Sequence, residues 1–391
     1  MGARQRHCRL VASREHEGTD AGSGKTDPAW FSEGFAEFRS TAKFDPDGAV
    51  GLGTPGNHRA YTLLNLERAM PVAKLLGYSG EKLNDDQRSA LYARGWLLVH
   101  YLTFEPSRQG QFKTYLSDFL DGKSVKEASA AFGNLDTLEK DLRAYLRRRQ
   151  LTYYRVTADK LPKPEIAMRQ LGPGEDAVMD LKMRSRRGVD REQALALLPE
   201  MRKAAAPFPS DPAVQATLAE AEYDAGNYKD AQAAADRALA ADADHMDSLI
   251  YKGRARLAIA GRGADPQVLR EARSWLLKAN RADPDDPEPM ILIYRSYLQQ
   301  GVEPGRSVKD ALLYAYNLAP EDLGLRMQVA QSLIMDGNVE GTRQALGPIA
   351  QDPHGGFLAD AARDILGLLD AGNTEEAKRR LNRGRDQADE S

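Results

Sequence analysis

Two carboxylates stand one helical turn apart in the segment PAWFSEGFAEF, residues 28–38. Glu33 and Glu37 share one face of a helix at this spacing. Paired carboxylates can carry general acid–base catalysis when a further group positions or shares the proton. No second group in the sequence is placed to complete such a site, so we do not expect acid–base catalysis by this pair.

A glycine-rich stretch, GTDAGSGKT, comes just before these glutamates and is similar to a phosphate-binding loop. Such a loop needs four residues between its first glycine and the Gly-Lys-Ser/Thr end, so that successive backbone N–H groups surround the phosphates. Here five residues separate Gly18 from Gly24, and Thr19 stands where the glycine belongs. Asp27 precedes Pro28, which disfavours the helix that must follow. We interpret the stretch as a flexible segment and expect no nucleotide binding.

The histidines are the other residues that could hold a metal ion. The chain has six, namely His7, His16, His58, His100, His245 and His354. No two of them stand at ligand spacing. Asp20 follows His16 by four residues, but the intervening glycine makes a helix there unfavourable. His100, near the end of an apolar helix, is expected to be a partly buried helix-face residue.

The composition limits the classes of partner. The 391 residues have a net charge of −3 with both signs interleaved, so neither nucleic acid nor a membrane surface is an expected partner. A single cysteine, Cys8, excludes an intramolecular disulfide framework. No apolar run is long enough to span a bilayer, and the first residues lack a secretory signal. We expect a cytoplasmic protein as written, or an exported, periplasmic one if the N-terminus is truncated.

The N-terminal part of the chain reads as a lead-in followed by a helical domain. Residues 1–27 are polar and glycine-rich and are expected to be disordered. From Pro28 to residue 150, apolar side chains recur at three- and four-residue steps, as in Phe31, Phe35 and Phe38. Arg147–Arg149 fall at the end of its last helix, where cations are favourable.

A short connector is predicted over residues 151–190. LTYYRVT is β-branched and aromatic, and MDLKMR alternates apolar residues with charged ones, so we predict two short strands. In the second of them, the alternating basic residues are expected to form a solvated face; they are Lys182, Arg184, Arg186 and Arg187. Prolines and glycines between the strands argue against a sheet domain.

The remainder, residues 191–391, is predicted to be helical hairpins in series. Parts of the segment that begins at Asp211 recur from Ala272 and from Val329, with a period in the mid-thirties. Gly226 supplies a positive-φ residue that ends a first helix. Tyr228 stands at the same turn, and several further positions suit close helix packing, namely Leu218, Ala219, Ala231 and Ala238. We predict about four hairpins, with an unrelated helical bundle as the alternative. We also expect three tyrosines mostly to pack between helices, namely Tyr228, Tyr294 and Tyr297.

This repeat pattern resembles the tetratricopeptide (TPR) repeat. The resemblance implies an α-solenoid whose groove binds a protein or an extended peptide. The fold class expected for the whole chain is therefore mainly α: a helical domain, a short β-containing connector and a TPR-like solenoid.

PAWFSEGFAEF and the later LYARGWLLVHYL resemble gluzincin metallopeptidases, over residues 28–150. The resemblance implies that Glu33 is the position of the third zinc ligand, and that Gly34 lets its helix pack closely on the metal-binding helix. The family's two zinc-binding histidines, in His-Glu-x-x-His about twenty residues earlier, have no counterpart here. One carboxylate does not hold zinc usefully, so we expect no cofactor and no catalytic residue in the chain as written.

The expected function is therefore protein or peptide binding by a TPR-type chain that carries an incomplete, inactive metallopeptidase-like domain. The alternative is a zinc-dependent peptidase whose His-Glu-x-x-His helix is missing from this version of the chain. The abrupt change of composition at Pro28 favours a displaced start or a disrupted reading frame upstream of it.

Overall fold

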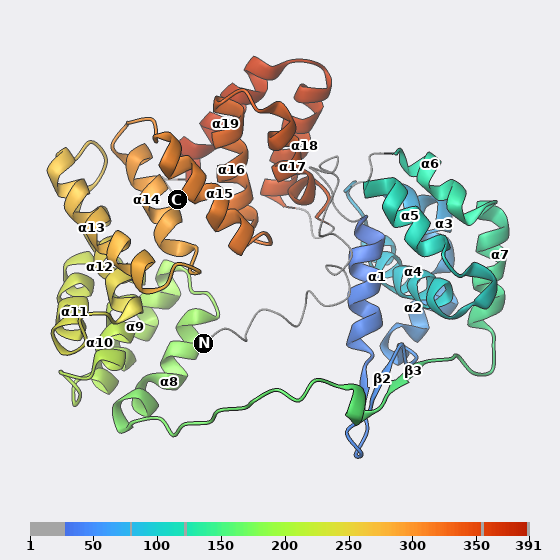
Figure 1. The fold of residues 1–391 in the computed structure, drawn as a ribbon, viewed down its shortest axis with the longest axis horizontal. Coiled ribbons are helices and arrows are strands. Elements are labelled where there is room, and N and C mark those ends of the chain that lie inside the picture. The colour runs from blue at the N-terminus through green and yellow to red at the C-terminus, as the bar shows by residue number, and fades with distance from the viewer. Residues whose placement is uncertain (1–27, 79, 121–122, 353–355, 389–391) are drawn as a thin grey trace. The chain divides into compact units, whose positions relative to one another are not determined.

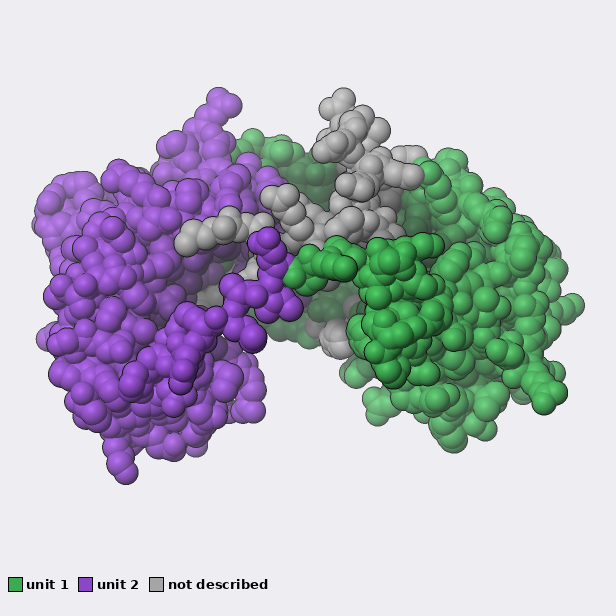
Figure 2. Space-filling model, turned by 60° about the horizontal axis from the view of Figure 1, so that its bottom comes forward, with its two compact units in different colours: residues 1–164, 326–391 green, residues 165–325 purple. Residues whose placement is uncertain are grey.

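The computed structural model describes residues 28–388, apart from 79, 121–122 and 353–355. The predictions that concern residues 1–27, including the glycine-rich loop, His7, His16 and Asp20, and the one that concerns His354 lie outside the described residues. The chain divides into two compact units. Unit 1 contains the described residues up to Pro164 and those from Arg326 onward, and unit 2 is Glu165–Leu325 (Figure 2).

The N-terminal domain, residues 28–156 of unit 1, contains seven α-helices and short 3₁₀ turns (Figure 1). The α-helices are α1 (Ala29–Ser40), α2 (Ala60–Asn65), α3 (Val72–Gly77), α4 (Asp85–Phe104), α5 (Gln111–Leu120), α6 (Val125–Ala128) and α7 (Leu135–Leu146). The longest, α4, begins with a capping box in which Asn84 and Gln87 each bond the other's backbone N–H. Asp85 and Asp86 in its first turn face the positive end of the helix dipole.

The core of this domain is aromatic. Trp30 and Trp96 are both 1% exposed, and the indole N–H of Trp30 donates to the Tyr115 hydroxyl at 3.3 Å. Phe38 is buried, whereas Phe31 and Phe35 are partly buried against the same cluster, which confirms the expected apolar face of α1. Because each ring removes a large apolar area from water, these aromatic residues fix α1 on the domain.

A pair of glycines allows α1 and α4 to cross at close range. A Cβ added to Gly34 would lie 2.3 Å from the carbonyl carbon of Gly95, and a Cβ on Gly95 would lie 2.7 Å from the Trp30 oxygen. Gly34 therefore permits a close helix contact. The helix that it contacts is α4, which follows α1 in the chain; the metal-binding helix that the resemblance implied would precede α1, outside the described residues.

A small antiparallel sheet completes the domain. Its strands are β1 (Lys43–Phe44), β2 (Val50–Leu52) and β3 (Tyr154–Val156), in the order β1-β2-β3, with Gly51 opposite both Lys43 and Arg155. The strand predicted in LTYYRVT is confirmed as β3. It pairs with β2 of the N-terminal domain, so it forms part of that domain's sheet.

The second predicted strand, MDLKMR, is wrong. These residues lie in α8 (Pro173–Arg186), which begins with Pro173 and has Glu175 and Asp176 in its first turn. Val178, Leu181 and Ser185 are buried, a helical spacing of three and four that outweighs the local alternation of Met179, Leu181 and Met183. Lys182, Arg184 and Arg186 consequently lie on a helix, with Arg187 as its C-cap.

Unit 2 is built from helices that pair with their neighbours in sequence (Figure 1). They are α8, α9 (Arg191–Ala205), α10 (Pro212–Asp224), α11 (Tyr228–Ala241), α12 (Met246–Ala260), α13 (Pro266–Ala282), α14 (Glu288–Gln299) and α15 (Arg306–Leu318). These eight helices form four antiparallel pairs before the last part of the chain begins. The prediction of about four hairpins within residues 191–391 did not include the pair α8–α9, because α8 lies in the segment that was expected to be a connector.

The predicted repeat landmarks have the expected structural roles. Gly226 has φ +80° between α10 and α11, which confirms its helix-ending role. Ala219, Ala231 and Ala238 are fully buried where the helices cross. Small side chains at these crossings let neighbouring helices approach closely.

Four more helices follow, and they lie wholly or largely in unit 1. They are α16 (Leu323–Met335), α17 (Val339–Ala350), α18 (Phe357–Asp370) and α19 (Thr374–Ala388). The Gln331 side chain on α16 donates to the Leu381 carbonyl on α19 at 2.8 Å. In the described part of the chain, no helix is both long and apolar enough to cross a membrane.

Candidate functional site

Glu33 and Glu37 lie on α1, but the second carboxylate is already engaged. His58 Nε2 lies 2.9 Å from Glu37 Oε2, and Arg59 donates to the other oxygen. An ionised carboxylate only accepts hydrogen bonds, so the His58 nitrogen carries the proton in this contact. Burial opposes ionisation of Glu37, but the hydrogen bonds from Arg59 and His58 outweigh it and lower the pKa of Glu37.

Tyr92 on α4 contacts Arg59 and lies close enough to Glu33 to be affected by its charge. The Arg59 guanidinium lies over the Tyr92 ring, 5.2 Å from its centroid. Burial, and secondly the charge of Glu33, raise the pKa of Tyr92 to about 12. The five residues Glu33, Glu37, His58, Arg59 and Tyr92 are named here the α1–α4 cluster. Tyr92 therefore remains a neutral phenol at physiological pH. Glu37, through its contacts with His58 and Arg59, holds the 3₁₀ turn Asn57–Arg59 against α1.

The described histidines have structural partners. His100 is fully buried, more so than expected; its Nε2–H donates to the Gly53 carbonyl at 2.9 Å, and its Nδ1 accepts from the Tyr145 hydroxyl at 2.9 Å. His245 caps α12, with Nδ1 accepting from the backbone N–H of Ser248. Among the described residues, no three His, Cys, Asp or Glu side chains are grouped so that they could hold a metal ion.

Unit 2 carries a second candidate site that the sequence reasoning missed. A connected row of charged and tyrosine side chains runs across α8, α10, α12 and α14, the first helices of the four pairs. We call it the first-helix strip; its members are Lys182, Arg186, Glu220, Tyr223, Asp224, Asp247, Tyr251, Arg254 and Glu288.

Ion pairs connect one first helix to the next in this strip. Arg186 on α8 contacts Glu220 on α10 at 3.2 Å and Asp247 on α12 at 2.7 Å. Arg254 on α12 contacts Glu288 on α14 at 2.9 Å. These contacts place side chains of four successive first helices side by side.

Aromatic contacts lie in the middle of the strip. The Tyr223 and Tyr251 rings meet edge to face with centroids 5.9 Å apart, and the Arg254 guanidinium lies 5.4 and 5.3 Å from the two centroids. Tyr228 extends the aromatic group, 5.2 Å from Tyr223. Tyr294 is buried, and Tyr297 stacks under Arg273 at 3.8 Å, which supports packing roles for both tyrosines.

Burial alters the ionisation of the strip. It raises the pKa of Glu220, Asp224 and Glu288 above their ordinary values, although Arg186 and Arg254 act in the opposite direction. The neighbouring cations therefore do not fully offset the free-energy cost that burial imposes on the ionised form of these carboxylates. The basic residues predicted to form a solvated face are in part members of this network, since Lys182 and Arg186 both contact Asp247.

A sequence signal for the strip exists. Glu220, Tyr223 and Asp224 stand at helical spacing, as do Asp247, Tyr251 and Arg254, and both sets occupy the first helix of a pair. The signal is weak because charged residues at this spacing usually form an ordinary solvated helix face.

Neither a protein-family model nor a curated protein matches this chain. Several solved structures are similar to it, and three of them are each 19% identical in sequence. TTC0263, a thermophilic TPR protein from Thermus thermophilus, matches 49% of this chain and 97% of its own, with a TM-score of 0.40. The MamA RS-1 ArsTM double mutant matches 47% and 99% with a TM-score of 0.35, and MamA 41-end from Desulfovibrio magneticus RS-1 matches 45% and 91% with 0.33.

Proposed function

We propose that the chain is a TPR-type binding protein that holds an extended segment of a protein partner along the first-helix strip. The observation that supports this proposal is the continuity of the strip, in which ion pairs link side chains of four successive first helices. Tyrosine and arginine side chains supply much of the binding energy at protein interfaces. Tyr223, Tyr251 and Arg254 provide such a group at the centre of the strip.

The charge of the strip favours partner segments that carry lysine or arginine. The pKa values of Glu220, Asp224 and Glu288 are raised because burial is not fully compensated by neighbouring cations. A further positive charge beside them would stabilise their ionised forms. Binding of a basic peptide should therefore weaken as salt screens these charges.

Peptide selection tests the proposal. A random peptide library is selected on the full chain, and the affinities of selected peptides are measured by fluorescence anisotropy. We expect Asp247→Asn and Glu288→Gln each to weaken binding of a basic peptide about tenfold, the effect of losing one charge-assisted contact. Glu192→Gln, at an exposed position of α9 outside the strip, is the matched control. Equal affinities for the strip variants and the wild type, with folding confirmed by circular dichroism, would refute the proposal.

We also propose that the metallopeptidase-like resemblance of the N-terminal domain does not extend to activity. A zinc site at Glu33 needs two imidazoles beside it. His58 is held by Glu37, His100 by Gly53 and Tyr145, and His245 by Ser248. The assignment of Glu33 as a third-ligand position therefore stays a prediction from the resemblance.

The alternative, a zinc-dependent peptidase, makes a separate prediction. Elemental analysis of the purified full chain and a casein cleavage assay with and without chelator distinguish the two. Stoichiometric zinc that is lost in Glu33→Ala, together with chelator-sensitive cleavage, would overturn the non-catalytic assignment. The same result would leave the peptide-binding proposal for unit 2 standing, because the two sites lie in different units.

A further inference from the structure

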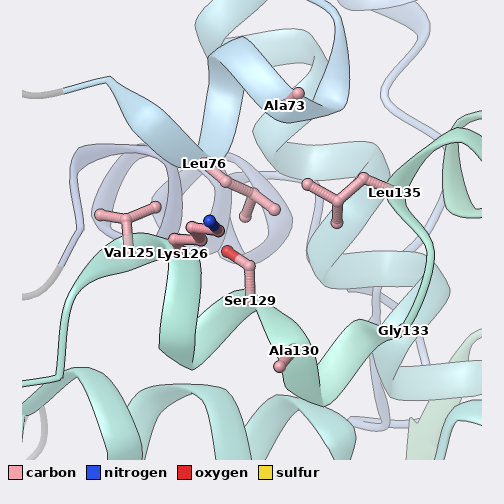
Figure 3. A pocket seen from close by; sticks show the side chains of 8 residues that line it. All are labelled: Ala73, Leu76, Val125, Lys126, Ser129, Ala130, Gly133 and Leu135. Carbon is pink, nitrogen blue, oxygen red and sulfur yellow. The ribbon is translucent and has the colours of Figure 1, made fainter.

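A pocket in the N-terminal domain belongs neither to the α1–α4 cluster nor to the first-helix strip. It has a volume of about 480 Å³ and is formed by α3, α6, the 3₁₀ turn Ser129–Phe132 and the start of α7 (Figure 3). Its lining residues are Ala73, Leu76, Val125, Lys126, Ser129, Ala130, Gly133 and Leu135. The volume lies within the range of small-molecule sites, roughly 300–1,000 Å³.

The lining combines an apolar body with one small polar corner. Leu76, Val125 and Leu135 present aliphatic side chains to the pocket (Figure 3). Lys126 and Ser129 lie one helical turn apart, and their nitrogen and oxygen atoms lie on the same side of the pocket, near Leu76 (Figure 3). Lys126 is exposed, so its ammonium group does not lose its hydration in the free protein.

Ser129 has no evident structural use for its hydroxyl. The residue is 5% exposed, and its Oγ is buried without a hydrogen-bond partner among the residues that the structure describes. Buried hydroxyls are nearly always paired, so an unpaired one that lines a pocket points to a missing acceptor. The side chain is short, and a change of χ1 between staggered rotamers is enough to turn the hydroxyl toward a ligand.

We propose that this pocket binds a small monocarboxylate with an aliphatic body. The carboxylate accepts hydrogen bonds from the Ser129 hydroxyl and the Lys126 ammonium group, both of which are donors. The aliphatic body lies against Leu76, Val125 and Leu135, where it leaves water. An amine of the same shape is repelled by Lys126, and an alcohol lacks the charge that Lys126 pairs with.

Octanoate, 1-octanol and octylamine are the probes, titrated into the full chain by calorimetry. We expect octanoate to bind and to raise the melting temperature, because a ligand that binds only the folded state stabilises it. Ser129→Ala and Lys126→Gln should each weaken octanoate binding about tenfold. Lys140→Gln, at an exposed position on α7 that does not line the pocket, should leave binding unchanged.

Two further readouts separate a ligand site from a structural defect. Without ligand, Ser129→Ala should be at least as stable as the wild type, because it removes an unpaired buried hydroxyl. Ala73→Phe, which adds volume to the pocket and keeps both donor residues, should abolish octanoate binding. Equal affinities for octanoate and 1-octanol, or full affinity in Lys126→Gln, would overturn the proposal, as would the absence of octanoate binding to the wild type.

Discussion

His100 shows how a residue type that could do chemistry serves the fold. Its ring lies 4.9 Å from that of Trp96, and both its nitrogens are engaged, with Gly53 and Tyr145. Burial lowers the pKa of His100 to about 4, although the backbone hydrogen bonds oppose the shift. The imidazole is therefore neutral in the folded protein at physiological pH and connects α4, α7 and the turn that follows β2.

This shift predicts a pH-dependent loss of stability. The folded pKa lies below the unfolded value of about 6.5, so the unfolded state binds the proton more readily. The contribution of His100 is present in full above about pH 6.5 and is lost as the pH falls toward 4. Between pH 7.5 and 4.5, the wild type should lose roughly 2–3 kcal/mol more of its unfolding free energy than His100→Gln.

Urea unfolding followed by tryptophan fluorescence measures this difference. His245→Gln is the control, because the partly buried His245 caps α12 in unit 2. If His100→Gln and the wild type lose the same free energy over this pH range, His100 titrates normally and its neutral, buried role is wrong.

The α1–α4 cluster could be predicted only in part. Glu33 and Glu37 are visible in the sequence as residues one turn apart. The contact between Glu37 and the pair His58–Arg59 joins positions 21 and 22 residues apart, and the spacing of a helix does not report it. Side chains from separate elements meet through tertiary packing, which is why the partners of Glu37 were not anticipated.

At the level of elements, the crossing of α1 and α4 shows most clearly how a helix contact can exclude added side-chain volume. The obstacles that a Cβ at Gly34 would meet are backbone atoms of Gly95, which cannot rotate away as a flexible side chain can. Gly253, within α12, differs, because a Cβ there would first meet the Leu276 side chain of α13, at 2.5 Å. The two helices of the N-terminal domain are consequently less tolerant of added volume than the repeat helices.

Gly34→Ala should therefore destabilise the protein by about 2 kcal/mol, since overpacking outweighs the better helix propensity of alanine. Gly367→Ala is the matched control, because Gly367 lies in α18 with open space around its added Cβ. That control should gain about 0.7 kcal/mol from helix propensity. Thermal unfolding of both variants decides the matter; a stabilised Gly34→Ala protein would show that the helices do not cross closely.

Elements with strong periodicity or a specific turn residue could be predicted. The short strand β3 was also found, from its β-branched and aromatic residues, whereas β1 and β2 were not. Gly226 and the buried alanines of α10 and α11 located a helical pair correctly. β1 and β2 have two and three residues, too few to show an alternating pattern. MDLKMR alternates over six residues, yet the proline and acidic residues that begin α8 govern its conformation.

At the scale of the whole molecule, the two units do not follow the order of the sequence. Residues from Arg326 onward group with the N-terminal part, and Glu165–Leu325 forms a unit of its own. Repeat similarity alone would assign all residues from 191 to one body. Local patterns describe single helices, but the division into units depends on contacts between distant segments.

The segment between the units offers the last prediction. Residues 161–172 form neither helix nor strand, and residues 162–170 are all exposed. Ile166 is 77% exposed and Met168 is 91% exposed, so few packing contacts hold this backbone. Exposed segments without regular hydrogen bonding are the preferred sites of proteolysis.

Limited trypsin digestion should therefore cut first after Lys160 or Arg169, among the bonds between residues 28 and 388. Lys163 precedes Pro164 and is a poor site, and the ion pair between Arg169 and Glu175 should slow cleavage at Arg169 relative to Lys160. Intact-mass spectrometry identifies the fragments, and Lys160→Gln combined with Arg169→Gln should slow the first cut about tenfold. Lys140→Gln, on a regular helix, should change nothing. Cleavage within a helix requires local unfolding, whereas this segment is already extended. Early cuts within α9–α15 would therefore mean that the helical pairs of unit 2 are less stable than their packing indicates.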